Sequence, residues 1–353
     1  MGPTAKELLE LTLKQCLSRI PFNSSINPLM LEHLRYEMEK TNNLDKNCVI
    51  LFDEMKLASG LHYEAHKQVI TGYADLGHLG RSSKLANHAL VFMVRISTAH
   101  LKEPIKQNIE QLQAIGLTVL ATVCDQGVTN QAALEKLCEG TRENALAASF
   151  TVNKQTVCVI NDVPHLLKNT RKCLLKEKLK FKPSKEAKLE YIEKAFNLDK
   201  EKRHESKHFC KMCITYYLPI LGSSSCPTKM YQCPLSYTSV HLEFWNQMLK
   251  EIADWRIFDL NSNKDITNLY SFAKGWQITL RSTIYIWNNL KNQGMKYLSL
   301  KSFNQDQLEN LFGVIRQHEI CNTNPSCHQF VAALKTAVVN SMATSVSSGN
   351  CEN

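Results

Sequence analysis

The 353-residue chain is 44% hydrophobic, which is enough apolar material for two or three folded domains and excludes a disordered protein. Its 42 basic and 33 acidic residues give a net charge of +9, which favours an anionic partner such as nucleic acid. The chain has no run of 18 apolar residues, and charged residues interrupt its first twenty positions. We therefore expect an intracellular protein without a membrane partner.

The first part of the chain is predicted to be helical and then to change to strands. Two amphipathic helices are expected within residues 1–44, the second starting at Asn27-Pro28. Apolar, β-branched runs then predict successive strands at residues 47–55, 68–74 and 89–96, with glycines at the connections. Consecutive strands of this kind favour an antiparallel start to a sheet.

The next segment alternates helices with strands. A helix is predicted to follow Pro104 and to stop at Gly116. The elements after it are predicted in the order strand 117–124, helix 129–139, strand 156–160 and a helix from Pro164. The resulting order, β-β-β-α-β-α-β-α, is that of an RNase H-like fold, an α/β architecture in which helices flank a mixed sheet.

The later part of the chain is predicted to form a second, largely helical domain over about residues 180–300. Two further helices are expected at 306–318 and 328–342. Four tryptophans of the second domain have aliphatic neighbours, so they are expected in a core rather than as platforms for stacked bases. They are Trp245, Trp255, Trp276 and Trp287. Most cysteines stand singly in apolar runs, as Cys48 and Cys158 do, and are predicted to be free thiols.

Two acids at the ends of predicted strands are candidates for metal chemistry. Asp53 has the parity of Val49 and Leu51, so its carboxylate is directed toward the inner end of its strand. Asp125 ends another strand and is followed by Gln126-Gly127, which permits a sharp turn. An aspartate at the end of a strand is more often a turn former or a helix cap, and that alternative applies to each of them.

Chemistry at a phosphodiester with two Mg²⁺ ions needs a third acid, because hard cations take oxygen ligands. The predicted helix at 306–318 has Leu308, Phe312 and Ile315 on its inner face, and Glu309 borders that face. Asp306 lies one turn earlier on nearly the same side. Position alone therefore leaves both Asp306 and Glu309 open as the third ligand.

Four ordered segments resemble P-element transposases, including the vertebrate proteins that join such a transposase to a THAP zinc finger. The segments are LFDEM around Asp53, VCDQGVTNQ around Asp125, NDVPHLLKNTRK from Asn161, and SFNQDQLENLFGVIRQ from Ser302. The similarity extends from about residue 45 to 320 and weakens between about 205 and 260.

The resemblance implies the chemistry and the cofactors. It implies a catalytic triad of Asp53, Asp125 and Glu309 that binds Mg²⁺ or Mn²⁺, in an RNase H-like domain split by an insertion that binds GTP. Asp306 is then a contact to GTP or to the insertion domain. The implied partners are transposon-end and target DNA, bound by a homo-oligomer in the nucleus.

The corresponding domain boundaries divide the chain into five parts. They are an amino-terminal helical segment (1–44), the first part of the RNase H-like domain (45–175), the insertion domain (176–300), the carboxy-terminal helical part of the RNase H-like domain (301–342) and a disordered tail (343–353). The chain departs from the family in several respects. No Cys and His set of a THAP zinc finger precedes Asp53, and the insertion has no G-x-x-x-x-G-K-[ST] loop.

Basic residues on the predicted helix after Pro164 are candidates for binding DNA phosphates. They are Lys168, Arg171 and Lys172, with His165 at the strand-to-helix junction as a further phosphate contact or a proton-handling group. The alternatives are a solvated helix face, and an Asp162 that caps the helix beside a packed His165.

A zinc site is a further alternative for the second domain. His208, Cys210 and Cys213, with Cys226 and Cys233 downstream, have suitable ligand chemistry, but their spacing is irregular and favours free thiols.

Taken together, the sequence predicts an enzyme, a transposase that cleaves the phosphodiester at transposon ends and transfers the freed strand to target DNA. The competing hypothesis is a non-catalytic DNA-binding or protein-interaction protein that descends from a transposase.

Overall fold

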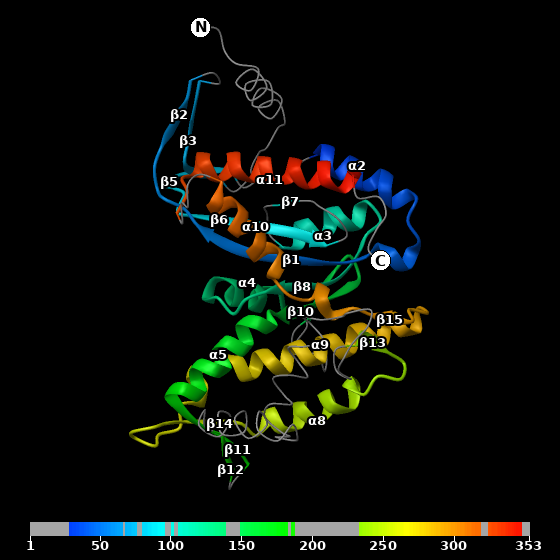
Figure 1. Ribbon diagram of the computed structural model, residues 1–353, viewed down its shortest axis with the longest axis vertical. Helices are drawn as coiled ribbons and strands as arrows, with labels where there is room; N and C mark the ends of the chain where they lie inside the picture. Colours follow the sequence, from blue (N-terminus) through cyan, green and yellow to red (C-terminus); the bar gives the residue numbers. More distant parts are fainter. Residues whose placement is uncertain are drawn as a thin grey trace. The chain divides into compact units, whose positions relative to one another are not determined.

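The computed structural model describes residues 28–65, 68–75, 80–95, 100–101, 105–138, 149–182, 185–187, 233–318 and 324–347. The chain divides into two compact units, Met1–Thr118 with Asp306–Asn353, and Val119–Gln305. Figure 1 labels the helices and strands of both units. None of the described helices is long and apolar enough to cross a membrane.

In the first unit, a long antiparallel pair of strands forms the core of that unit. Strand β1 (Asn47–Lys56) pairs with β6 (His88–Arg95), and β6 pairs in turn with the short β7 (His100–Leu101). The apolar, β-branched run of β1 is buried on both of its faces, and Phe52 packs against Phe92 with ring centroids 5.6 Å apart. The strands predicted at 47–55 and 89–96 are confirmed.

The segment between β1 and β6 forms two hairpins, so the single strand predicted at 68–74 is divided into two short strands. Strands β2 (His62–Glu64) and β3 (Val69–Thr71) form one hairpin, and β4 (Tyr73–Asp75) and β5 (Arg81–Leu85) form the other. Gly72 separates β3 from β4 with a φ of +114°, and a Cβ there would collide with the carbonyl oxygen of Gly60. The apolar run of 68–74 is thus broken by a backbone conformation that favours glycine.

The helices of the first unit come from both ends of the chain. They are α2 (Pro28–Glu39), α3 (Ile105–Ala114), α10 (Asp306–Gln317) and α11 (Cys327–Ser347), with a 3₁₀ turn, η1 (Asn43–Lys46), before β1. Helix α10 contacts β1 and α11, and its buried residues are Leu308, Phe312 and Ile315. The inner face predicted for this helix is confirmed. Helix α11 continues to Ser347, past its predicted end at residue 342, because its alanine- and valine-rich sequence has no helix breaker there.

In the second unit, two parallel strands form the core. Strand β8 (Thr118–Cys124) pairs with β10 (Gln155–Asn161), so that Asn161 lies opposite Cys124. Helix α4 (Val128–Cys138) follows β8, and α5 (Val163–Lys176) follows β10, as the sequence predicted. Strand β9 (Ser149–Val152), which pairs antiparallel with β10, was not predicted. The sheet is therefore mixed, which agrees with the predicted fold class.

The rest of the second unit combines two long helices with small sheets. Helices α8 (His241–Ala253) and α9 (Phe272–Asn292) accompany a three-stranded sheet of β12 (Lys185–Ala187), β11 (Glu177–Lys182) and β14 (Arg256–Asp259). The shorter elements are β13 (Leu235–Ser236), β15 (Tyr297–Leu298), η5 (Thr267–Leu269) and η6 (Leu300–Ser302). The four tryptophans are all buried, as predicted.

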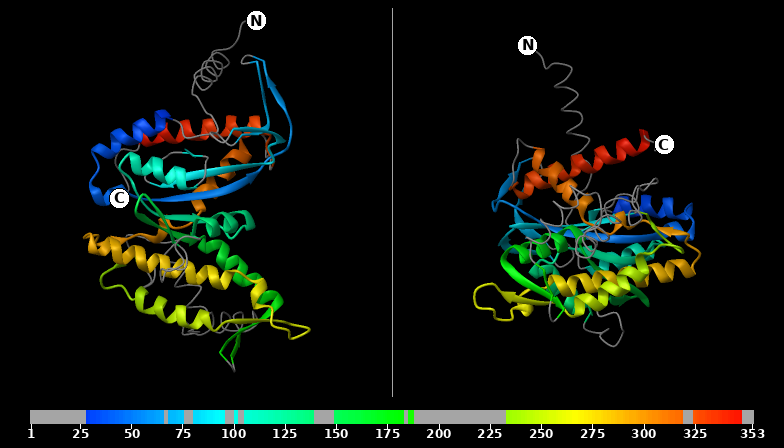
Figure 2. Two further views of the ribbon diagram at one scale, coloured as in Figure 1. Left: turned by 180° about the vertical axis from the view of Figure 1, so that it is seen from behind. Right: turned by 60° about the horizontal axis from the view of Figure 1, so that its bottom comes forward.

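Helix α9 is held against β10 and α5 by buried polar contacts. Ser282 donates its hydroxyl hydrogen to the carbonyl oxygen of Val159 at 2.7 Å, and Trp276 donates its indole N–H to the hydroxyl oxygen of Thr170 at 3.0 Å. Figure 2 shows α9 alongside α5 in both views. Since α9 packs on a core strand, it stabilises the end of β10 at which the candidate site lies.

Several sequence predictions concern residues outside the described ranges. The first predicted helix lies there, as do His208, Cys210, Cys213 and Cys226 of the zinc alternative. Cys233 is described and is a free thiol, and Cys48, Cys124, Cys158 and Cys173 are buried free thiols, as predicted. Burial raises the pKa of Cys48, and it raises the pKa of Cys158 to about 12. These thiols stay protonated and unreactive at neutral pH.

Candidate active site

In the first unit, Asp53 lies on β1 opposite Val91 and is half-buried. Its Oδ1 atom accepts a hydrogen bond of 2.8 Å from the backbone N–H of Glu54. The sequence predicted that Asp53 ends its strand, but β1 continues to Lys56 because Glu54 and Met55 stay paired with β6. Asp53 thus lies near the carboxyl end of a buried strand. Its pairing with Val91 of β6 fixes its position on that strand.

The other acids of the first unit lie on α10. Asp306 and Glu309 are both in its first turn, Asp306 half-buried and Glu309 exposed. The contact between α10 and β1 brings the helix that carries Glu309 to the strand that carries Asp53, although the two elements are far apart in the sequence. Carboxylates in a first turn are also favoured by the helix dipole, which supplies a structural explanation for both residues.

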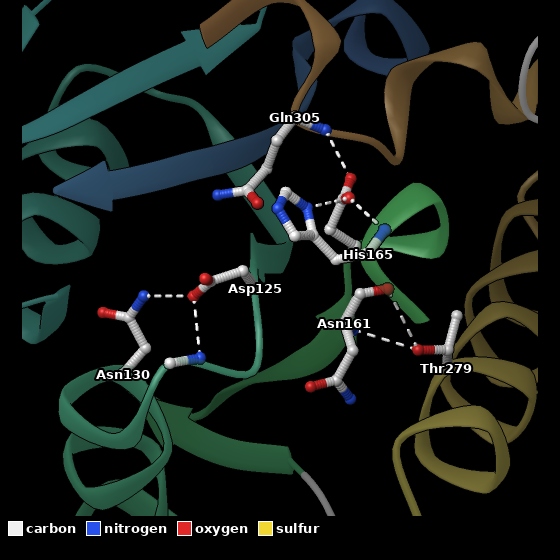
Figure 3. Close-up of polar contacts among 8 residues, drawn as sticks. Asp125, Asn130, Asn161, His165, Thr279 and Gln305 are labelled. Atoms are coloured by element: carbon white, nitrogen blue, oxygen red, sulfur yellow. Dashed lines mark hydrogen bonds and ion pairs between the residues drawn. The ribbon is translucent and has the colours of Figure 1, made fainter. Parts of the chain in front are cut away.

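In the second unit, Asp125 follows β8 and begins the turn into α4. Its Oδ1 atom accepts hydrogen bonds from the backbone N–H of Gly127 at 2.9 Å and from the Nδ2 atom of Asn130 at 2.8 Å (Figure 3). One carboxylate oxygen of Asp125 therefore stabilises the turn, which is the alternative role that the sequence allowed. The second oxygen, Oδ2, receives no hydrogen bond from the part of the chain that the structure describes.

Asp162 follows β10, the strand parallel to β8, and its backbone N–H donates to the carbonyl oxygen of Cys124 at 2.8 Å. Asp125 and Asp162 thus lie at the same carboxyl edge of the parallel pair. Asp162 is 1% exposed. Its Oδ2 atom accepts from the backbone N–H of His165 at 3.0 Å and lies 2.7 Å from the Nδ1 atom of the same residue. Its Oδ1 atom accepts from the backbone N–H of Gln305 at 2.8 Å (Figure 3).

Two of these contacts were not predicted from the sequence. Asn130 lies five positions after Asp125, so an amide side chain on the first turn of α4 was a detectable signal for a partner of Asp125. Gln305 is joined to Asp162 through its backbone N–H, and a backbone contact over 143 residues leaves no signal in the side-chain pattern. The predicted capping role of Asp162 is confirmed, whereas His165 is 28% exposed rather than fully packed.

The basic residues of α5 lie on its exposed side. Lys168, Arg171 and Lys172 are exposed, and the opposite side of the helix is buried through residues such as Leu166 and Cys173. Residues three and four positions apart are neighbours on a helix, so the three cations form one group. His165 lies one turn before Lys168 on the same helix.

A cavity of about 490 Å³ lies beside this edge, between α4, the end of β10, the start of α9 and β14. Its wall includes Gln126, Asn161, Arg256, Tyr270 and Lys274. Gln126 donates its Nε2 hydrogen to the carbonyl oxygen of Ser271 at 3.0 Å, which joins the residue after Asp125 to the start of α9.

The phenol of Tyr270 is held as a neutral group in the cavity wall. Its hydroxyl donates to Oε1 of Glu177 at 3.0 Å. Burial, and next this hydrogen bond, raise the pKa of Tyr270 to about 12. Tyr270 is therefore a hydrogen-bond donor at neutral pH and not an anion.

Carboxylate oxygens are the ligands that Mg²⁺ and Mn²⁺ prefer, so Asp53, Asp125 and Glu309 have the correct donor chemistry. Among the described residues, no three His, Cys, Asp or Glu side chains lie close enough together to hold a metal ion. Each of the three acids has a side chain of the type that binds these ions.

Comparisons with known proteins identify the fold. Residues 22–138 match the model of the TNP-like RNase H N-terminal domain, and residues 302–335 match the TNP-like RNase H C-terminal domain. The structure is similar to a chain of the Drosophila P element transposase strand transfer complex, with a TM-score of 0.69 and 18% sequence identity, covering 96% of this chain and 85% of that one. A sequence search of curated proteins found no match.

The fold likeness confirms the RNase H-like architecture predicted from the element order. The two domain matches lie on either side of residues 139–301, which agrees with a domain whose two parts are separated in the sequence. Together these findings show an RNase H-like fold, in which residues 22–138 and 302–335 match the two parts of the TNP-like RNase H domain.

Proposed function

We propose that this chain is a metal-dependent DNA transposase core that cleaves phosphodiesters at transposon ends and transfers the freed strand to target DNA. The observation that carries the proposal is the contact between α10, which bears Glu309, and β1, which bears Asp53, in an RNase H-like fold. Because α10 contacts β1, Glu309 and Asp53 lie on neighbouring elements, as ligands of the same pair of metal ions must.

In this proposal, Asp53, Asp125 and Glu309 would hold the divalent ions through their carboxylate oxygens. The ions, when bound, supply activation of the attacking oxygen and stabilisation of the leaving oxygen. Asp53 is oriented by the pairing of β1 with β6, and Asp125 is oriented by Gly127 and Asn130. Asp53 and Asp125 thus each offer a carboxylate held by its local surroundings, which reduces the entropy lost on binding a cation.

Divalent-metal dependence of DNA nicking tests this function. With Mg²⁺ or Mn²⁺, the purified chain is expected to nick a duplex that carries the terminal repeats of its element, and EDTA is expected to abolish the reaction. Ca²⁺ at the same concentration controls for DNA binding without turnover. Binding of the duplex with no nicking in either Mg²⁺ or Mn²⁺ would instead favour a DNA-binding protein that descends from a transposase.

We propose that Lys168, Arg171 and Lys172 bind the phosphate backbone of the DNA. Their shared exposure on α5, on a side that starts one turn beyond His165, supports this role. Changing all three to Ala is expected to weaken binding of every DNA sequence and to lower the slope of log affinity against log salt by about one unit per lost phosphate contact. Fluorescence anisotropy at several salt concentrations measures both quantities.

Lys154 supplies the matched control for that experiment. It is exposed in the turn between β9 and β10, at the opposite end of β10 from Asn161, and so about 20 Å from the site along the strand. Lys154→Ala removes a charge from the same unit and is expected to leave the salt slope nearly unchanged. An equal loss in both variants would contradict a specific surface on α5.

We propose that the GTP implied by the sequence resemblance binds in the cavity beside α9. Its volume of about 490 Å³ suits a small molecule, and Lys274, Arg256 and the start of α9 supply positive charge for phosphates. Titration calorimetry is expected to give a binding isotherm that Lys274→Ala weakens about tenfold, while Lys250→Ala on α8 does not. If the titration gave no binding heat, GTP would not be a ligand of this chain. Asp306 stays a predicted contact of GTP or of the insertion domain.

A further inference from the structure

The carboxylate of Asp162 receives more hydrogen bonds than a helix cap needs. A capping aspartate accepts one backbone N–H of the first turn, and the bond from His165 N–H to Oδ2 at 3.0 Å fulfils that role. Asp162 also binds the imidazole of His165 through Oδ2 at 2.7 Å and the backbone N–H of Gln305 through Oδ1 at 2.8 Å. Two of its three hydrogen bonds are therefore unrelated to capping.

These contacts fix the direction of the carboxylate. The carboxylate is 1% exposed, so water contributes little to its hydrogen bonding and the protein donors determine its orientation. One oxygen is held by Gln305, which comes from a distant part of the chain, and the other by the first turn of α5. Rotation of the carboxylate would break both sets of bonds at once.

The fixed carboxylate determines the protonation pattern of the His165 ring. An ionised carboxylate only accepts hydrogen bonds, so Nδ1 of His165 is the donor in the 2.7 Å contact. The ring orientation is then set, and Nε2 is on the far side of the ring from Asp162. The side chain of His165 is 28% exposed, and it heads the exposed side of α5 that continues to Lys168.

We infer that Asp162 is a positioning residue, which holds His165 so that Nε2 contacts a phosphate oxygen of the DNA strand at the carboxyl edge of β8 and β10. The inference rests on the proposed function for the identity of the ligand. In the bound state the ring is an imidazolium, which donates Nδ1–H to Asp162 and Nε2–H to the phosphate. Asp162 itself does not touch the DNA.

A purely electrostatic role of Asp162 and a positioning role predict opposite effects of its replacement on DNA binding. Replacing Asp162 with Asn removes a negative charge, which should strengthen DNA binding if the residue had only a general electrostatic effect. Asn is also a good helix cap, so the start of α5 is retained. The amide, however, has one acceptor oxygen and cannot serve the imidazole and Gln305 together. Loss of affinity in Asp162→Asn would therefore report loss of the His165 geometry.

A double-mutant cycle on DNA binding in EDTA tests the inference without relying on catalysis. Asp162→Asn and His165→Ala are each expected to weaken DNA binding about tenfold, and the double variant is expected to be no weaker than His165→Ala. Asp259→Asn, at the half-buried end of β14 in the same unit, is the charge-matched control and should not weaken binding. The inference would be overturned if the affinity losses of the two single variants multiplied in the double variant, or if Asp162→Asn left the affinity unchanged.

A spectroscopic measurement separates this inference from the proposed function. Imidazole ¹⁵N spectra report which ring nitrogen carries hydrogen, and the His165 signals are assigned by their loss in His165→Ala. Wild-type protein without DNA should show a protonated Nδ1 on His165, and Asp162→Asn should change that signal. An unchanged signal would refute positioning by Asp162. If the wild-type chain bound no DNA, the proposed function would fail while this measurement still decided the role of Asp162.

Discussion

Replacing Glu309 with Gln is expected to lower metal-dependent DNA cleavage by about three orders of magnitude or more, while DNA binding and thermal stability stay near the wild-type values. Gln keeps the volume of the side chain but removes the charge that a divalent ion requires. Glu309 is exposed in the first turn of α10, so its replacement disturbs little packing. Single-turnover cleavage in Mg²⁺, with anisotropy for DNA binding, measures the two effects separately.

Asp306→Asn is the matched control, because it removes the same charge from the same helical turn. Its effect on cleavage is expected to be milder than that of Glu309→Gln. Asn retains hydrogen-bonding capacity at the helix start, while the favourable interaction with the helix dipole is reduced. If Asp306→Asn abolished cleavage and Glu309→Gln did not, the assignment of the third ligand would be wrong, although the fold identification would stand.

Phe312→Ala is expected to destabilise the first unit by about 3 to 5 kcal/mol, because a large buried ring leaves a cavity that the surroundings only partly fill. Phe312 is 2% exposed on the inner side of α10, the helix that contacts β1. Cleavage should fall as well, since Glu309 depends on the docking of this helix. Urea unfolding followed by circular dichroism gives the change in the free energy of unfolding.

Val314→Ala on the same helix is the control for that measurement. Val314 is 51% exposed, so its truncation should change the free energy of unfolding by less than about 0.5 kcal/mol. Equal stability losses in the two variants would show that α10 is not held by its Leu308, Phe312 and Ile315 face.

The sequence predicted the elements whose pattern is set locally. Strands β1, β8 and β10 are continuous apolar, β-branched runs, because both of their faces are buried, and this pattern is hard to mistake. Residues 68–74 have a similar composition but lie in exposed hairpins, where Ile70 is 49% exposed. Local composition does not distinguish a core strand from a projecting hairpin, and the decisive feature was the positive φ of Gly72.

The candidate site was only partly predictable for a related reason. Asp125 followed by Gln126-Gly127 is a local signal, and the turn it forms with Gly127 and Asn130 is a local structure. The bond between Asp162 and Gln305 depends on where the chain returns after more than a hundred residues. The helical periodicity of the sequence could not show whether Asp306 or Glu309 is the third ligand, because both residues lie in one helical turn.

The position of bound divalent metal distinguishes the proposed triad from every other ligand set. A crystal structure of the chain with Mn²⁺ and terminal-repeat DNA, with the metal identified by anomalous scattering, is expected to show two ions about 4 Å apart whose protein ligands are Asp53, Asp125 and Glu309. Ions held by other residues, or a Glu309 carboxylate more than roughly 10 Å from both aspartates, would contradict the account, since ligands that far apart cannot share a pair of metals.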